Sequence, residues 1–345
     1  MREKFMFGLL FLTLAILLSA CGSPATVATS VPVGQTPALQ AGSISINGAG
    51  ATFPYPLYSR WFYEFAFVDG TAKFNYQSIG SGGGIAQITA KTVDFGASDA
   101  ILSDAQLQAA KGVQMFPTVA GAIVPTFSLK GDDGKAITAT IKFPHTALAD
   151  IYLGKIKKWN DPVLTTANPD LKLPNKDIIA VYRSDGSGTT FVFTSFLSQV
   201  SSDFKEKVGS GTSVKWTQGL GGKGNEGVAG TVSQNDGAIG YVELAYATQN
   251  KLAFGTVQNK AGEYVMPSDA SVQAAMADFG TDLGDKLATL IVDAPSKSAY
   301  PIAAYTYLLV YMDQTDCVKG QKIVAFLKWA LSDGTKFATE LQYVP

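Results

Sequence analysis

Apolar runs of strand length alternate with helix-length segments along most of the chain, and turns of small residues join them. Residues 43–46 read Ser-Ile-Ser-Ile, an alternation that predicts a half-buried β-strand. Residues 57–62, Leu-Tyr-Ser-Arg-Trp-Phe, are predicted to be helical. The same order returns within residues 74–88, where a strand and a glycine turn precede another helix. Strands that alternate with helices predict an α/β fold.

The turns that follow the predicted strands carry small and polar residues. They occupy residues 47–56, 80–84, 96–99 and 184–190. One of them ends in a carboxylate, Asp99, and a capped helix is predicted to begin near Ser103. In open α/β sheets, ligands bind outside the carboxyl ends of the strands. We therefore expect these turns to converge on one small ligand.

The turn at residues 182–190 has the composition of an anion-binding site. It reads Tyr-Arg-Ser-Asp-Gly-Ser-Gly-Thr-Thr and precedes an apolar run, residues 191–197, that is long enough for a helix. The first N–H groups of a helix have no partner inside it, and that end is partly positive. Arg183 can donate two hydrogen bonds to an anion, and Asp185 is near enough to orient it. Taken alone, the segment fits an ordinary glycine turn before a capped helix equally well.

Further motifs, in a fixed order from residue 43 onward, give the chain a family resemblance. They include Gly-Ala-Gly-Ala-Thr-Phe-Pro at residues 48–54 and Ile-Gly-Ser-Gly-Gly at 79–83, with others at 93–99, 116–119, 150–159, 183–189, 219–225 and 237–243. On these motifs the chain resembles the phosphate-binding proteins of bacterial high-affinity phosphate ABC transporters. The resemblance implies an α/β fold of the two-lobed type II periplasmic-binding-protein kind, with a hinge between the lobes.

The resemblance also implies which residues bind phosphate. Asp99 is expected to accept a proton from the ligand, and Arg183 to pair with the anion while Asp185 holds the guanidinium. The remaining ligand positions give hydroxyl or backbone N–H groups, and they are Ala51, Thr52, Phe53, Ser81, Ser187, Gly188 and Thr189. The chain ends at Pro345, where the family usually continues through another helix, and no implied ligand position lies in residues 341–345.

The expected organisation is two lobes that the chain crosses between more than once. Residues 43–119 and 256–345 are predicted to form lobe I, and residues 120–255 lobe II. Residues 305–311 are predicted to be the closing strand, and residues 320–336 an amphipathic helix. Two crossings make a hinge, which suits closure around a ligand.

The N-terminus has the pattern of a targeting segment. Arg2 and Lys4 precede an apolar run that is too short for a comfortable membrane span, which predicts a signal peptide over residues 1–20. Leu-Ser-Ala-Cys-Gly at 18–22 resembles the bacterial lipoprotein cleavage site, so Cys21 is the expected lipidation site. The alternative is an ordinary signal peptide cut nearby. Residues 21–42 are uncharged and predicted to be a flexible tether. These features indicate an extracytoplasmic, lipid-anchored protein.

Composition restricts the possible partners. The 345 residues suit two domains, and 46% of them are hydrophobic, enough for a sizeable core. The net charge of −1 gives no reason to expect nucleic acid as a partner. His145 is the single histidine, so no standard transition-metal site and no cofactor are expected. The glycines of residues 219–224 fit a P-loop poorly and are predicted to form a mobile surface loop.

The sequence therefore predicts a monomeric binding subunit that takes up inorganic phosphate and passes it to an ABC transporter permease and ATPase. One alternative is a binder of another oxyanion such as sulfate. The other is a phosphomonoester hydrolase that uses Ser81 or Ser187, but neither serine lies in a Gly-x-Ser-x-Gly motif and only His145 could act as the base. No enzymatic activity is expected.

Overall fold

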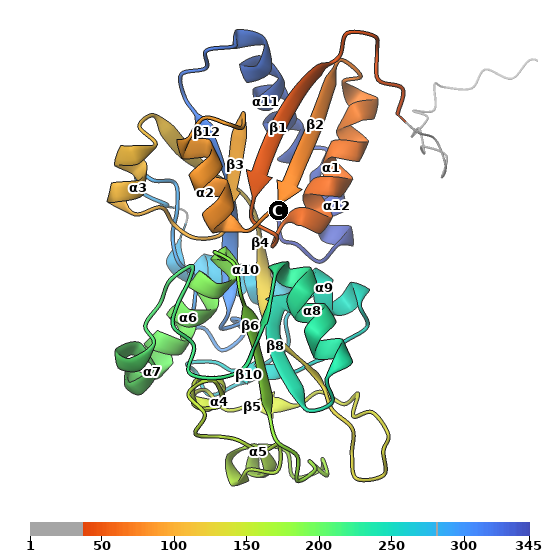
Figure 1. The fold of residues 1–345 in the computed structure, drawn as a ribbon, viewed down its shortest axis with the longest axis vertical. Coiled ribbons are helices and arrows are strands. Elements are labelled where there is room, and N and C mark those ends of the chain that lie inside the picture. The colour runs from red at the N-terminus through yellow and green to blue at the C-terminus, as the bar shows by residue number, and fades with distance from the viewer. Residues whose placement is uncertain (1–36, 281) are drawn as a thin grey trace, which may run out of the picture. The chain divides into compact units, whose positions relative to one another are not determined.

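The structure is a computed structural model that describes residues 37–280 and 282–345 (Figure 1). The predicted signal peptide, the lipidation site Cys21 and the tether as far as residue 36 lie outside the described residues. The strands are β1 (Ile44–Gly50), β2 (Ala72–Ser78), β3 (Phe95–Ser98), β4 (Val113–Ser128), β5 (Lys142–Phe143), β6 (Ile179–Arg183), β7 (Leu220–Gly222), β8 (Ala238–Glu243), β9 (Ala253–Phe254), β10 (Thr256–Gln258), β11 (Tyr264–Val265) and β12 (Ala303–Tyr311).

The helices occur between these strands, as the alternating pattern predicts. They are α1 (Tyr55–Val68), α2 (Ser81–Thr89), α3 (Asp104–Ala109), α4 (Ala147–Tyr152), α5 (Pro162–Ala167), α6 (Gly188–Val200), α7 (Ser202–Lys207), α8 (Gly224–Gln234), α9 (Leu244–Gln249), α10 (Asp269–Phe279), α11 (Cys317–Ala330) and α12 (Thr335–Glu340).

Strand β4 joins two halves of one sheet, whose strand order is β2-β1-β3-β12-β4-β8-β6-β7. Residues 113–122 of β4 pair antiparallel with β12, and residues 123–128 pair antiparallel with β8. On one side β1 runs parallel to β2 and β3, and on the other β6 runs parallel to β7 and β8. The predicted α/β, two-lobed fold is confirmed. The exact lobe boundaries, after residue 119 and after residue 255, stay a prediction.

Aromatic side chains fill the core on both sides of β4. In the half that holds β1, the ring centroids of Phe74 and Phe326 lie 4.8 Å apart. In the other half, the ring of Phe193 stacks on Tyr241 at 4.1 Å. Burying one such ring stabilises the fold by roughly 1.5–3 kcal/mol. Figure 1 shows α11 and α12, near the C-terminus, beside α1 near the N-terminus, so the core of this half joins distant parts of the chain.

Local sequence explains where the helices at the strand ends begin. The Ser187 hydroxyl caps α6 by accepting a hydrogen bond from the N–H of Thr190 at 3.0 Å. Ser103 and Gln106 form a capping box at the start of α3, as expected from the position of Ser103. Pro56 occupies the first turn of α1, where its missing N–H costs nothing. These caps place the helix starts directly after β1, β3 and β6.

Two local predictions are wrong. The segment at residues 320–336 is not one helix, because α11 ends at Ala330 and α12 begins at Thr335. The chain turns at Gly334, whose N–H donates to the Trp329 carbonyl and whose carbonyl accepts from the Trp61 indole at 2.8 Å. The glycines of residues 219–224 do not form a mobile loop, because they make up β7 and the start of α8.

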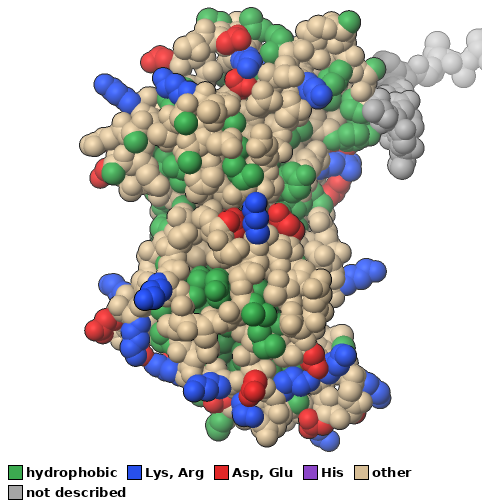
Figure 2. All heavy atoms as spheres, viewed as in Figure 1, with side chains coloured by type: hydrophobic (Ala, Val, Ile, Leu, Met, Phe, Trp, Pro, Cys, Tyr) green, Lys and Arg blue, Asp and Glu red, His purple; other side chains and the backbone are tan. Residues whose placement is uncertain are grey.

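Charges are mixed over the surface. Figure 2 shows Lys and Arg side chains interspersed with Asp and Glu on the face viewed, with no extended patch of one sign there. Among the helices that the structure describes, none is long and apolar enough to span a bilayer.

Candidate anion-binding site

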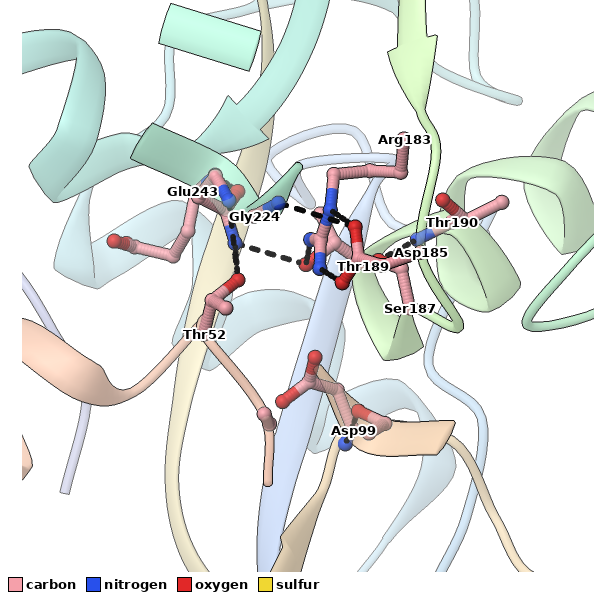
Figure 3. Close-up of polar contacts among 12 residues, drawn as sticks. Thr52, Asp99, Arg183, Asp185, Ser187, Thr189, Thr190, Gly224 and Glu243 are labelled. Carbon is pink, nitrogen blue, oxygen red and sulfur yellow. Dashed lines mark hydrogen bonds and ion pairs between the residues drawn. The ribbon is translucent and has the colours of Figure 1, made fainter. Parts of the chain in front are cut away.

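The residues predicted to bind an anion lie together at the ends of strands and the starts of helices. Ala51, Thr52 and Phe53 follow β1, and Ser81 begins α2. Asp99 follows β3, while Arg183 ends β6 and leads to the first turn of α6. Figure 3 shows Thr52, Asp99, Arg183 and Thr189 reaching toward a common region from these different elements. The predicted ligand-binding residues are buried, and they are Ala51, Thr52, Phe53, Ser81, Asp99, Arg183, Ser187, Gly188 and Thr189. Asp185, which was predicted to orient Arg183, is partly buried.

Backbone N–H groups on five of these buried residues have no acceptor in the described part of the chain. They belong to Thr52, Phe53, Ser81, Gly188 and Thr189. Buried backbone N–H groups are nearly always paired in native proteins, so a cluster without partners needs an external acceptor. Ser81 begins α2, and Gly188 and Thr189 begin α6, where the N–H groups and the helix dipole favour negative charge. The backbone alone therefore provides an anion site.

The Arg183 guanidinium is fixed by its neighbour and still has donors for a ligand. Its Nε and Nη2 donate to the two carboxylate oxygens of Asp185 at 2.8 and 2.6 Å, and Nη1 lies 3.5 Å from Thr189 Oγ1. A guanidinium has five N–H groups, so Nη1 and Nη2 each keep one for a ligand. Burial acts to raise the pKa of Asp185, but Arg183 and the Gly224 N–H outweigh it and hold that pKa below its ordinary value.

Three hydroxyls in the site are oriented as donors. Ser81 Oγ accepts from the Asp99 N–H at 3.2 Å. Thr52 Oγ1 accepts from both the N–H and the Nδ2 of Asn225, at 3.1 and 2.7 Å. Thr189 Oγ1 also accepts from Asn225 Nδ2, at 3.2 Å, as well as from Arg183. Because each oxygen already accepts from the protein, its own proton is left to donate: to a ligand from Thr52, and to Asp99 or a ligand from Ser81 and Thr189.

Asp99 is the acceptor among these donors. Its Oδ1 accepts from the Thr306 hydroxyl at 2.8 Å, and the residue is only 3% exposed. Burial raises the pKa of Asp99 to about 7, against the lowering effects of the Thr306 hydroxyl, the Arg183 charge and the Ser81 and Thr189 hydroxyls. Ser103, and not Asp99, caps the following helix, so Asp99 has no capping role that would explain its burial.

Glycines let the two halves of the site approach closely. A Cβ added to Gly188 would lie 2.5 Å from Ser81 Oγ and 2.6 Å from Asp99 Oδ2, which is too close for any side chain. The Gly82 N–H donates to the Gly186 carbonyl at 2.9 Å, and the two backbones touch there. The first turn of α6 therefore packs directly against the loop that holds Ser81 and Asp99.

A site with many donors and one carboxylate fits a small oxyanion that still carries a proton. Within the described residues, no group of His, Cys, Asp and Glu could hold a metal ion. The arrangement of donors at strand ends on both sides of β4 defines a two-lobed anion-binding protein.

Comparison with known proteins identifies the family. The profile of the PBP superfamily domain matches residues 25–334. The phosphate-binding protein PstS of Xylella fastidiosa (strain 9a5c) is 46% identical over 98% of this chain and 93% of its own length. PstS of Haemophilus influenzae is 49% identical over 91% of both chains. The chain thus belongs to the PBP superfamily and, within it, to the family of PstS phosphate-binding proteins.

Solved structures share the fold. A phosphate-binding protein from Stenotrophomonas maltophilia superposes with a TM-score of 0.62 at 20% sequence identity, over 88% of this chain and 91% of that one. A high-affinity periplasmic phosphate-binding protein solved with bound phosphate gives a TM-score of 0.66 at 21% identity, over 88% and 90%. At such low identity the likeness shows the two-lobed fold.

The sequence did not predict Asn225 as a site residue. Its side chain joins Thr52 to Thr189, and its Oδ1 accepts from the Glu243 N–H at 2.9 Å. The sequence did contain a signal for Asn225, because this residue ends the family motif at residues 219–225. The glycines before it, however, were interpreted as a loop. The Asn225 side chain is buried because α8 begins at Gly224, directly before it.

The serines that a hydrolase would use have other partners. Ser187 Oγ caps α6, and Ser81 Oγ accepts from the Asp99 N–H. His145 Nε2 pairs with Asp293 Oδ1 at 2.8 Å and its ring contacts Phe196. In the described chain, His145 is bonded to neither serine, so no Ser-His pair is assembled.

Proposed function

We propose that this chain binds inorganic phosphate outside the cytoplasm and delivers it to the permease of an ABC transporter. The observation that carries the proposal is the buried Asp99 carboxyl inside a cluster of donors. The unpaired N–H groups and Arg183 attract any small oxyanion. Asp99 favours an oxyanion that brings a proton, because only such a ligand can donate to the carboxylate.

The proposed ligand contacts are those of the family pattern. The N–H groups of Thr52, Phe53, Ser81, Gly188 and Thr189 bind phosphate oxygens, with hydroxyls from the same set adding donors. Arg183 supplies two charge-assisted hydrogen bonds, and Asp99 accepts the ligand proton. Ala51 and Ser187 complete the two loops, and Asp185 orients the guanidinium.

Calorimetric titration with phosphate, sulfate and arsenate tests the ligand. Phosphate and arsenate both carry a proton near neutral pH and are expected to bind, whereas sulfate is expected to bind more weakly, because Asp99 must first take up a proton to accommodate it. Sulfate binding as tight as phosphate binding would contradict the proposal. An aryl phosphate incubated with the protein should not turn over, because we propose a binding subunit and not an enzyme.

The remaining parts of the proposal concern location and partners. A lipid on Cys21 would hold a monomeric binding subunit at the outer face of the cell membrane, with residues 21–42 as the tether. The partners are the transporter's permease and ATPase, and the mixed surface charge in Figure 2 gives no reason to add nucleic acid.

A further inference from the structure

The loop after β1 contributes its N–H groups to the site, and its carbonyls are bonded in an unusual way. Three successive carbonyls each accept a hydrogen bond from a tyrosine hydroxyl. Tyr76 donates to the Ala51 oxygen at 2.8 Å. Tyr246 donates to the Thr52 oxygen at 2.6 Å, and the Tyr343 hydroxyl lies 2.8 Å from the Phe53 oxygen.

The three tyrosines reach this loop from distant parts of the chain. Tyr76 lies on β2, the neighbouring strand, and is partly buried. Tyr246 lies on α9, in the half of the fold that holds β6 and β8, and is 5% exposed. Tyr343 follows α12 and is fully buried, next to the bridge between Ala120 and Val344. Local turn formation cannot explain such a convergence.

The geometry of the peptide bond explains what the carbonyl bonds achieve. A trans peptide is planar, and its C=O and N–H point in opposite directions. Holding the Ala51 carbonyl toward Tyr76 turns the Thr52 N–H to the other side. Holding the Thr52 carbonyl toward Tyr246 does the same for the Phe53 N–H. These are two of the N–H groups that have no acceptor in the described chain.

We propose that Tyr76 and Tyr246 are positioning residues that fix the carbonyls of Ala51 and Thr52 and thereby aim the N–H groups of Thr52 and Phe53 at the bound anion. Tyr343 anchors the end of the same loop, because the peptide of the Phe53 carbonyl leads to Pro54 and has no N–H to aim. The inference rests on the proposed phosphate function. Burial raises the pKa of each of the three phenols well above its ordinary value, so their hydroxyls keep the proton that they donate.

Glu243 completes the arrangement at Tyr343. The Tyr343 hydroxyl lies 2.8 Å from Glu243 Oε2 as well as from the Phe53 oxygen, but a phenol has one proton. That proton is shared between the two acceptors, and Glu243 Oε2 also accepts from the Ala245 N–H at 2.9 Å. Glu243 therefore helps to hold the Tyr343 hydroxyl beside the Phe53 carbonyl.

Tyr246 ties the loop to the other half of the fold. Its helix follows β8, whereas the 51–53 loop follows β1, so the Tyr246–Thr52 hydrogen bond crosses between the two halves. The Asn225–Thr52 bonds cross in the same place. The Phe53 N–H is therefore held toward the proposed anion position only when the two halves of the fold are in contact.

The test compares Tyr246→Phe, Tyr343→Phe and Tyr76→Phe with a matched control. Each variant keeps the ring and removes the hydroxyl. The control is Tyr307→Phe, because Tyr307 is 1% exposed and donates to the Thr289 carbonyl at 3.1 Å, within the cluster beneath α2 and α3. Calorimetry with inorganic phosphate is expected to show affinity about fivefold or more lower for Tyr76→Phe and Tyr246→Phe, and unchanged affinity for Tyr307→Phe. Tyr343→Phe should lower stability and change affinity less, because no N–H follows the Phe53 carbonyl. A melting curve of each variant records the loss of stability separately.

Amide proton shifts give a readout that a purely structural role would not move. In the wild type, phosphate should shift the Thr52, Phe53, Gly188 and Thr189 amide protons downfield. In Tyr246→Phe the Phe53 shift should shrink while those of Gly188 and Thr189 remain. Equal affinities and equal Phe53 shifts in Tyr246→Phe and Tyr307→Phe would overturn the inference. Absence of phosphate binding in the wild type would instead overturn the proposed function.

Discussion

At the scale of single residues, Asp99 and Arg183 act in opposite directions. In the proposed site, Arg183 and the surrounding N–H groups attract any small anion, and a charged Asp99 repels an anion without a proton. The Asp99 pKa of about 7 reflects the cost of its charge in this buried position. Next to a bound phosphate, the carboxylate and the ligand share a proton, so they titrate as a pair.

The raised pKa of Asp99 predicts a pH dependence of stability for the phosphate-free protein. Between about pH 4, the ordinary aspartate pKa, and pH 7, the folded state holds a proton that the unfolded state has lost. Over that window the free energy of unfolding falls as pH rises, by at most about 1.4 kcal/mol per pH unit from this group. Denaturant melts of wild type and Asp99→Asn at pH 5.0 and 7.5 measure it. From pH 5.0 to 7.5, the free energy of unfolding should fall more for the wild type than for Asp99→Asn. The same change in both proteins would contradict the raised pKa of Asp99.

Arg183 is expected to supply a large part of the affinity. Each charge-assisted hydrogen bond contributes roughly 1.5–3 kcal/mol, and the guanidinium has two N–H groups for the ligand. Arg183→Ala should weaken phosphate binding by more than about tenfold. Asp185→Ala should weaken phosphate binding less, since the positive charge of Arg183 stays and only its orientation is lost. Calorimetry checks both variants, and unchanged affinity in Arg183→Ala would remove this residue from the site.

At the scale of elements, the starts of α2 and α6 face each other across the site. Glycine at the first position of α6 is what allows the contact, because a side chain there would overlap Ser81 and Asp99. The close approach places N–H groups from both helix starts near one another, where the proposed anion would accept from both.

Gly188→Ala should therefore weaken phosphate binding at least tenfold, since the new methyl group would hold the two loops apart. Gly230→Ala is the matched control, because Gly230 lies in α8 with nothing within 4 Å of an added Cβ. It should leave binding unchanged and can add up to about 1 kcal/mol of stability through helix propensity. Titration of both variants decides the point, and wild-type affinity in Gly188→Ala would contradict the packing described here.

The sequence predicted the elements that carry the site because their signals are local. A strand, a glycine turn and a capped helix are each encoded within about ten residues, as at Arg183 and Ser187. The break between α11 and α12 was missed although its signal is local, because Ser332, Asp333 and Gly334 form a turn sequence and the Gly334 N–H bonds back to the Trp329 carbonyl. The Trp61 indole then holds the Gly334 carbonyl from a distant part of the chain.

At the scale of the whole described molecule, contacts between distant segments could not be predicted. Asn225 joins Thr52 to Thr189, and Tyr343 reaches Phe53 from the C-terminal segment. No implied ligand position lies in residues 341–345, and yet the Tyr343 hydroxyl donates to a carbonyl of the loop that is proposed to bind the ligand. Alternation of polar and apolar residues predicts which faces are buried, but not which buried polar groups meet.

The lipid anchor is a prediction about residues outside the described part of the chain. Several acyl chains anchor a protein stably, whereas one does so only marginally. Cys21→Ser should release the protein from membranes without changing its phosphate affinity. Fractionation of cells that express each form measures the change. Equal membrane association of wild type and variant would rule out anchoring through Cys21.

Selection of a protonated oxyanion by Asp99 is tested most directly by four titrations at pH 8, phosphate and sulfate into wild type and Asp99→Asn. Phosphate still carries a proton at this pH, and sulfate carries none. Sulfate can bind the wild type once Asp99 takes up a proton, and with a pKa of about 7 this uptake lowers the sulfate affinity by about tenfold at pH 8. Sulfate should therefore bind the wild type more weakly than phosphate and gain about tenfold in Asp99→Asn, while phosphate affinity changes much less. A sulfate-to-phosphate ratio that is the same in both proteins would contradict this role of Asp99.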